Sequence, residues 1–135
     1  MKIHTSDITK MRDPFVFVEG GIMYAYGTDW ICSRNVTGSL ESGWEEPVPV
    51  VELPENYGIV TDTSDIDYSN WAPEVYKYNG SYYMFTTYRL KSRKTRGCTV
   101  LKADNPMGPF RPHSDGIITP EEWDCIDATL YFENG

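Results

Sequence analysis

Residues 12–28 read RDPFVFVEGGIMYAYGT, residues 71–87 read WAPEVYKYNGSYYMFTT, and the two segments align without a gap. Proline, valine, tyrosine, threonine and the turn glycine coincide, and aromatic residues coincide at two further positions. Each segment is an alternating run, a tight turn and a second alternating run, which is the pattern of a β-hairpin. We therefore predict strands over residues 15–18, 22–28, 74–78 and 81–88, with a further strand over residues 98–102.

A third copy of the pattern begins at Asp127 and reaches only as far as Gly135. The copies recur at intervals of 59 residues, from Asp13 to Ala72, and 55 residues, from Ala72 to Asp127. Nine prolines and eleven glycines leave little room for long amphipathic helices. Repeated hairpins without helices predict an all-β fold made of β-propeller blades.

The same repeat sets our expectation for domain organisation. We expect residues 1–135 to be an N-terminal fragment of a single β-propeller catalytic domain, holding about two blades and the start of a third. The third copy stops at its turn, which would leave a strand edge unpaired. We therefore also expect the chain to self-associate through its unpaired blades.

Composition excludes several classes of function. A formal net charge of −8 argues against a nucleic-acid partner, because binding phosphates needs clustered Lys and Arg. No apolar run approaches the ~18 residues of a membrane span, so we expect no membrane partner. Six of the twelve basic residues fall between Arg89 and Lys102, and we interpret this stretch as a solvated loop between strands.

The remaining signals concern cellular location and cysteine chemistry. The first residues show no apolar secretion signal, so we expect a cytoplasmic protein unless a leader has been removed. Asn35-Val36-Thr37 fits a glycosylation sequon. Cys32, Cys98 and Cys125 are widely spaced and form no C-x-x-C pair, so we expect reduced thiols in the core.

A carboxylate lies at or near the start of the first strand in every copy: Asp13, Glu74 and Asp127. Equivalent strands of a propeller line its axis, so residues at matching repeat positions converge on one pocket. Converging carboxylates suit glycoside hydrolysis, in which one activates water and another protonates the leaving oxygen. Each is also a common turn or strand-start residue, but three at matching positions favour the functional interpretation.

Three motifs together resemble glycoside hydrolase family 43: RDPF at 12–15, WAPEV at 71–75 and IDATLY at 126–131. The stretches GPF at 108–110 and ITPEEW at 118–123 add to the resemblance. The resemblance covers essentially the whole chain. It implies a five-bladed propeller and an inverting enzyme that acts on arabinofuranosides and xylosides.

The resemblance also implies roles for individual residues. Asp13 would be the general base that activates water, and Asp127 would tune the pKa of the general acid and orient it. Arg12 would pair with a carboxylate or a sugar hydroxyl, Trp71 would offer an apolar face, and Glu74 would accept hydrogen bonds. The family's general acid is a Glu in the blade after the Asp127 motif, which these 135 residues do not reach. We therefore expect the chain alone to hydrolyse unactivated glycosides poorly, because general acid catalysis contributes ~10²–10⁴-fold.

The other tryptophans and the histidines carry weaker signals. Trp30 follows the strand that leaves the pocket region, and we include it as a candidate sugar-stacking residue, with a core or rim position as the alternative. Trp44 is interpreted as packing between blades, and Trp123 as packing or pocket rim. His4 and His113 are isolated, so we predict no metal site. Some relatives hold a calcium ion on the propeller axis, but nothing in the sequence identifies its ligands, and we expect no cofactor.

The predicted partner is a carbohydrate, an arabino- or xylo-oligosaccharide. Two alternatives remain open from the sequence. One is a non-catalytic carbohydrate-binding propeller fragment. The other is a fructoside-cleaving five-bladed relative, in which an Arg-Asp-Pro motif belongs to a later blade; the early position of Asp13 and the motif at 71–74 disfavour it.

Overall fold

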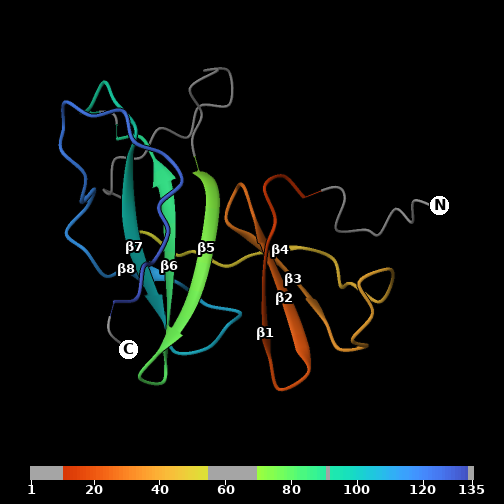
Figure 1. Ribbon diagram of the computed structural model, residues 1–135. Helices are drawn as coiled ribbons and strands as arrows, with labels where there is room; N and C mark the ends of the chain where they lie inside the picture. Colours follow the sequence, from red (N-terminus) through yellow and green to blue (C-terminus); the bar gives the residue numbers. More distant parts are fainter. Residues whose placement is uncertain (1–10, 55–69, 91, 134–135) are drawn as a thin grey trace.

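The computed structural model describes residues 11–54, 70–90 and 92–133 and shows two four-stranded antiparallel sheets (Figure 1). The strands of the first sheet are β1 (Phe15–Glu19), β2 (Ile22–Gly27), β3 (Ile31–Asn35) and β4 (Val48–Pro49). Those of the second sheet are β5 (Asn70–Tyr78), β6 (Ser81–Tyr88), β7 (Gly97–Ala103) and β8 (Arg111–Pro112). Within these ranges no segment is helical, so none is a helix able to cross a membrane. His4 lies outside the described residues.

Both predicted hairpins are confirmed, and they turn in the same way. Each turn has two residues, Gly20-Gly21 in the first copy and Asn79-Gly80 in the second, and the flanking residues pair across it. All four turn residues have positive φ, between 46° and 81°. Two consecutive residues with positive φ match the right-handed twist of the strands, and this need explains Gly and Asn at these positions.

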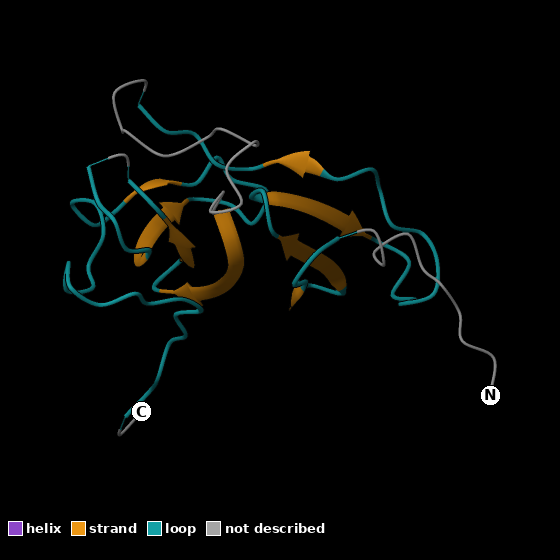
Figure 2. Cartoon of the chain, turned by 90° about the horizontal axis from the view of Figure 1, so that it is seen from above, coloured by secondary structure: helices purple, strands orange, loops and turns teal. Residues whose placement is uncertain are grey.

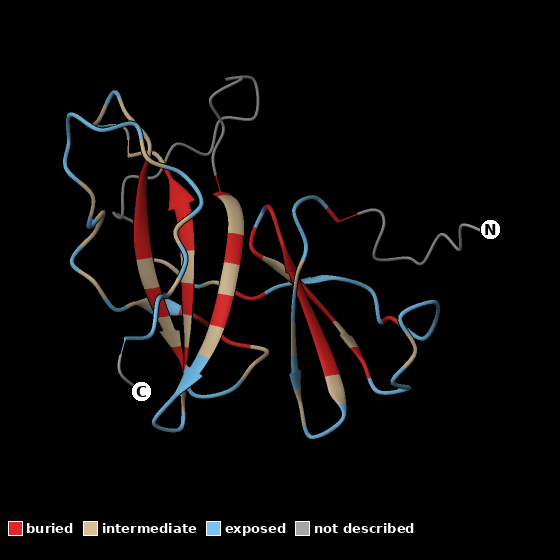
Figure 3. Ribbon diagram, viewed as in Figure 1, coloured by how far each residue is buried: buried red, intermediate tan, exposed pale blue. Residues whose placement is uncertain are grey.

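The two sheets lie side by side as neighbouring blades, with β1 and β2 next to β5 (Figures 1 and 2). Tyr24 and Tyr26 of β2 belong to the same buried cluster as Tyr82 and Met84 of β6. The bands of buried residues along both sheets are visible in Figure 3. The main core therefore lies between the sheets, as blade-on-blade packing requires.

Aromatic rings and hydrogen bonds join the sheets. The rings of Trp30 and Tyr88 meet edge to face, with centroids 6.2 Å apart. The indole Nε1 of Trp30 donates a hydrogen bond to Thr86 Oγ1 at 2.9 Å, and the hydroxyl of Tyr26 donates one to the carbonyl of Pro106 at 2.7 Å. Aromatic pairs of this geometry contribute ~0.5–1.5 kcal/mol beyond the area they bury.

The repeat extends to the direction in which side chains face. Tyr83 and Phe85, the equivalents of Tyr24 and Tyr26, point away from the first sheet. They line a hollow of about 380 Å³ together with Tyr78 and four residues of the third copy, Leu130, Tyr131, Phe132 and Glu133. The third copy thus lies on the second sheet as the second sheet lies on the first. It is not a strand over its described residues, because no described segment pairs with its backbone. Self-association through this face remains a prediction.

The other face of the first sheet has its own small core. Met23 and Ala25 of β2 face away from the second sheet and are covered by Met11 and Trp44. Trp44 is buried, with 8 % of its surface exposed, and its indole nitrogen donates to the carbonyl of Leu40 at 3.2 Å. Trp44 is therefore a packing residue, but within the described chain it covers its own blade rather than the space between the two blades.

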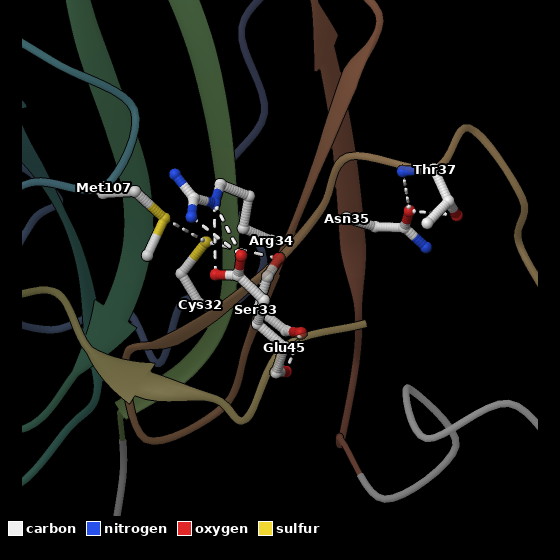
Figure 4. A network of polar contacts seen from close by, with 7 residues as sticks. All are labelled: Cys32, Ser33, Arg34, Asn35, Thr37, Glu45 and Met107. Atoms are coloured by element: carbon white, nitrogen blue, oxygen red, sulfur yellow. Dashed lines mark hydrogen bonds and ion pairs between the residues drawn. The ribbon is translucent and has the colours of Figure 1, made fainter. Parts of the chain in front are cut away.

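The loop after β3 is organised by one buried side chain, Asn35 (Figure 4). Its amide nitrogen donates to the carbonyls of Ser39 and Ser42, at 2.7 and 2.8 Å, and its oxygen accepts from the backbone of Thr37 at 2.8 Å. Asn35 has no exposed surface. The sequon that it begins is therefore a structural motif in this fold, since its amide nitrogen is already committed.

The cysteines are unpaired, as expected. Cys32 and Cys98 are buried, and burial raises the pKa of both thiols, that of Cys32 to about 12. Cys125 is only half-buried, so the prediction of core positions is confirmed for two of the three.

Replacing Trp30 with Phe tests the junction between the sheets. The variant loses the hydrogen bond to Thr86 and part of the buried ring, so we expect the free energy of unfolding to fall by ~1–3 kcal/mol. Urea unfolding followed by circular dichroism measures the change. Trp123→Phe is the matched control, because Trp123 is 58 % exposed and should change stability by less than ~0.5 kcal/mol. Equal losses in the two variants would contradict the assigned role of Trp30.

Candidate active site

The starts of the three copies meet at one hollow. Its volume is about 220 Å³, and it is lined by Arg12, Asp13, Trp71, Ala72, Ile126 and Asp127. The structure therefore brings together four of the residues that the sequence singled out, although the first and last lie at opposite ends of the chain. The volume is below the ~300–1,000 Å³ of typical ligand pockets and is on the scale of a single sugar ring.

Three equivalent positions of the repeat share an unusual backbone conformation. Asp13, Ala72 and Asp127 occupy equivalent positions in the repeat and have φ values of 50°, 40° and 57°. Positive φ is uncommon for residues other than glycine and costs ~1–3 kcal/mol each, so the surrounding structure must hold it in place. Strain of this kind clusters at functional sites, and these three residues line the same hollow. The other described non-glycine residues with positive φ, Asp29, Trp30 and Asn79, lie in turns.

Two equivalent threonines hold Asp13 and Asp127. The hydroxyl of Thr28, at the end of β2, donates to Asp13 Oδ2 at 2.9 Å, and its backbone nitrogen donates to the carbonyl of Arg12 at 3.0 Å. The hydroxyl of Thr87, at the matching position of β6, accepts from the backbone nitrogen of Asp127 at 2.9 Å. Thr28 thus fixes Asp13, the carboxylate residue of its own copy. Thr87 fixes Asp127, the carboxylate residue of the next copy.

Glu74 and Trp30 are not in the lining. Glu74 lies further along β5, where its Oε2 accepts a hydrogen bond from the hydroxyl of Tyr76 at 2.6 Å. Burial, and then this bond, raise the pKa of Tyr76. Trp30 is 6 % exposed and belongs to the core between the sheets. This position agrees with the core alternative and gives no support to sugar stacking, because the inter-sheet core covers the indole that a sugar would need to reach.

The basic stretch after β6 is not simply a solvated loop, contrary to the sequence interpretation. The guanidinium of Arg93 donates to the carbonyls of Thr119, at 3.2 Å, and Pro120. That of Arg96 forms an ion pair with Asp124, and their hydrogen bonds lower the pKa of Asp124 to about 2. This stretch therefore holds the segment that leads to Asp127. The only signal in the sequence was the basic cluster itself, which did not identify its partner.

Metal chemistry finds no support in the described part of the chain. Over residues 11–54, 70–90 and 92–133 no three His, Cys, Asp or Glu side chains gather closely enough to hold an ion. The hollow contributes two carboxylates, Asp13 and Asp127, and one of them already accepts a hydrogen bond from Thr28. The described residues do not form a calcium site.

Comparison with known proteins identifies a family and several solved structures that resemble this chain. The sequence pattern of the glycosyl hydrolases family 43 matches residues 9–135. An endo-arabinase from Bacteroides thetaiotaomicron VPI-5482 is 29 % identical, with a TM-score of 0.73, over 92 % of this chain and 42 % of its own. A thermostable family-43 glycoside hydrolase is 19 % identical, with a TM-score of 0.69, over 92 % and 38 %. No curated protein matches the sequence.

A third solved structure, a β-xylosidase/α-arabinofuranosidase from a compost microbial metagenome, is 22 % identical, with a TM-score of 0.54, over 80 % of this chain and 36 % of its own. The fold is that of the five-bladed glycosidase propellers: the repeat predicted propeller blades, and the resemblance implied the five-bladed type. The chain belongs to glycoside hydrolase family 43. It spans less than half the length of these three structures.

Thr87→Val tests how the start of the third copy is held. The variant keeps the shape of the side chain but leaves the backbone nitrogen of Asp127 without its partner. We expect amide hydrogen exchange at Asp127 to accelerate about tenfold, the equivalent of ~1.4 kcal/mol for one lost hydrogen bond. Thr28→Val is the matched control, because Thr28 holds Asp13 instead and should leave exchange at Asp127 unchanged. Unchanged exchange in Thr87→Val would show that other contacts hold Asp127.

Proposed function

We propose that this chain forms part of an inverting glycoside hydrolase that acts on arabinose- or xylose-containing glycosides. Asp13 is the general base, and Asp127 is the carboxylate that tunes and orients the general acid. One observation carries the proposal: Asp13 and Asp127 line a single hollow together with Arg12 and Trp71. Membership of family 43 supports the reaction class.

The geometry suits Asp13 to the role of base. In an inverting mechanism the base takes a proton from water as the water oxygen attacks the anomeric carbon, while an acid protonates the departing oxygen. Asp13 is exposed at the hollow, so water reaches it. The hydrogen bond from Thr28 uses Oδ2 and orients the carboxylate, and we assign the proton transfer to Oδ1.

The same hollow offers contacts for a sugar. Trp71 supplies an aromatic surface for the apolar face of the ring, and Arg12 supplies donors for hydroxyls. We assign Glu74 a supporting part beside the hollow, where it accepts from Tyr76. Arabinose is our first choice of substrate, because the structure that is 29 % identical is described as an endo-arabinase.

The proposal needs a general acid from elsewhere. Glutamate does not occur among the residues that line the hollow. We propose that the acid comes from the part of a family 43 domain that this chain does not span. A substrate with a poor leaving group would therefore react slowly, since a positioned acid contributes ~10²–10⁴-fold.

Trp71→Ala tests carbohydrate binding by the chain itself. We expect 1,5-linked arabinotriose to shift NMR signals of residues at the hollow, and we expect the variant to bind it about tenfold more weakly, a change of ~1.4 kcal/mol. Trp123→Ala is the control, because Trp123 is exposed and does not line the hollow. A fructo-oligosaccharide that bound in place of arabinotriose would favour the fructoside-cleaving alternative.

Asp13→Asn tests the general base with a substrate that needs no acid. A dinitrophenyl α-arabinofuranoside has a leaving group that departs without protonation. We expect the wild-type chain to hydrolyse it slowly and the variant to lose ~10²–10⁴-fold of that rate. Asp104→Asn, at an exposed position outside the hollow, should keep the wild-type rate. Arabinotriose binding without turnover of this substrate would support a non-catalytic carbohydrate-binding chain instead.

A further inference from the structure

Arg96 touches two of the three segments that build the hollow. It lies directly before β7, and its guanidinium carbon is 4.9 Å from the centre of the Trp71 ring, which is the distance of a cation–π contact. The same guanidinium donates to both carboxylate oxygens of Asp124, through Nε to Oδ1 at 3.0 Å and through Nη2 to Oδ2. The Arg96 guanidinium therefore contacts Trp71, which lines the hollow, and Asp124, which lies three residues before the lining residue Asp127.

The backbone of Arg96 binds the same segment. Its nitrogen donates to Asp124 Oδ1 at 2.8 Å, and its carbonyl accepts from the nitrogen of Cys125 at 3.3 Å. Asp127 follows two residues after Cys125. Side chain and backbone of one residue thus hold the approach to Asp127 at four points.

The segment needs such anchors because it has no regular structure of its own. Residues 120–133 form neither strand nor helix, so no ladder of backbone hydrogen bonds fixes them. Thr87 holds Asp127, Arg93 holds the carbonyl of Pro120, and Thr95 donates to the carbonyl of Glu121 at 2.5 Å. Thr87 also pairs with Trp71 through the backbone of β6, whereas Arg96 places its side chain against the Trp71 ring.

We propose that Arg96 is a positioning residue of the hollow, which holds Trp71 and the segment carrying Asp127 in one fixed arrangement. Planarity matters here, because a guanidinium can lie against the indole ring and donate two parallel hydrogen bonds to a carboxylate at once. A lysine supplies the charge without that geometry. The expected effect of Arg96 on sugar binding rests on the function proposed above, whereas its effect on the positions of Trp71 and Asp127 does not.

Arg96→Gln is the principal test, with Arg34→Gln as its matched control. Arg34 likewise binds a carboxylate, that of Glu45, through Nε and Nη2, but it lies on the first sheet away from the hollow. In Arg96→Gln we expect amide exchange at Asp127 to accelerate about tenfold, the indole NMR signal of Trp71 to move, and affinity for arabinotriose to fall about tenfold. Arg34→Gln should change none of these.

Two further variants separate the contacts. Asp124→Ala breaks the ion pair but leaves Arg96 beside Trp71, so we expect faster exchange at Asp127 with a smaller change at the indole. Arg96→Lys keeps the charge and should recover only part of each loss. These variants also carry the test if Arg96→Gln does not fold.

The outcomes distinguish this inference from the proposed function. Unchanged Asp127 exchange and an unchanged Trp71 signal in folded Arg96→Gln would overturn the positioning role. The positioning role would also be overturned if Arg96→Lys and Asp124→Ala both showed the wild-type Asp127 exchange and the wild-type Trp71 signal. If the wild type binds no arabinotriose but Arg96→Gln alters both Asp127 and Trp71, the positioning role stands and the sugar assignment fails.

Discussion

The packing of the β2–β3 turn against the second sheet is the interaction on which the rest of the structure depends. Trp30 lies in this turn, buried against Tyr88 and hydrogen-bonded to Thr86. The neighbouring Asp29 donates its backbone nitrogen to the carbonyl of Asn70 at 2.9 Å, at the first residue of β5. Because β1 and β5 are each paired within their own sheet, joining the sheets here also sets where their starts lie relative to each other. The contacts of this junction therefore help to place the starts of β1 and β5 at the hollow.

A second constraint follows from that arrangement. Three residues other than glycine adopt positive φ at the hollow, and none of them would do so alone at low cost. The hydroxyls of Thr28 and Thr87 supply hydrogen bonds to two of these starts. The third, Ala72, lies between Trp71 and Pro73 where β5 departs from regular pairing with β6, between Trp71 and Glu74. The irregular backbone is thus stabilised by strands that are themselves regular.

The three walls of the hollow differ in how they are held. Trp71 and Ala72 belong to the paired strand β5, Arg12 and Asp13 directly precede β1, and the third wall is an unpaired segment attached by arginine and threonine side chains. Charge-assisted hydrogen bonds are short-ranged and directional, so they can fix a segment that lacks a partner strand. The Arg96–Asp124 pair is partly exposed and contributes modestly to stability, which makes its geometry more important than its energy. A site built in this way depends on a few side chains and not only on the fold.

The hairpins, their turns and the phase of the repeat could be predicted from the sequence. These are local properties: alternation with a period of two, and Gly or Asn where φ must be positive. The repeat phase was also enough to predict that Asp13 and Asp127 would meet, because equivalent positions in a propeller face the same axis, but it placed Glu74 with them, and Glu74 does not line the hollow. Tertiary structure alone decided that Trp30 is buried, that Glu74 lies beside the hollow, and that basic residues after β6 hold the third copy. Burial and ion pairing depend on which distant segments arrive at a side chain, and no local pattern records that.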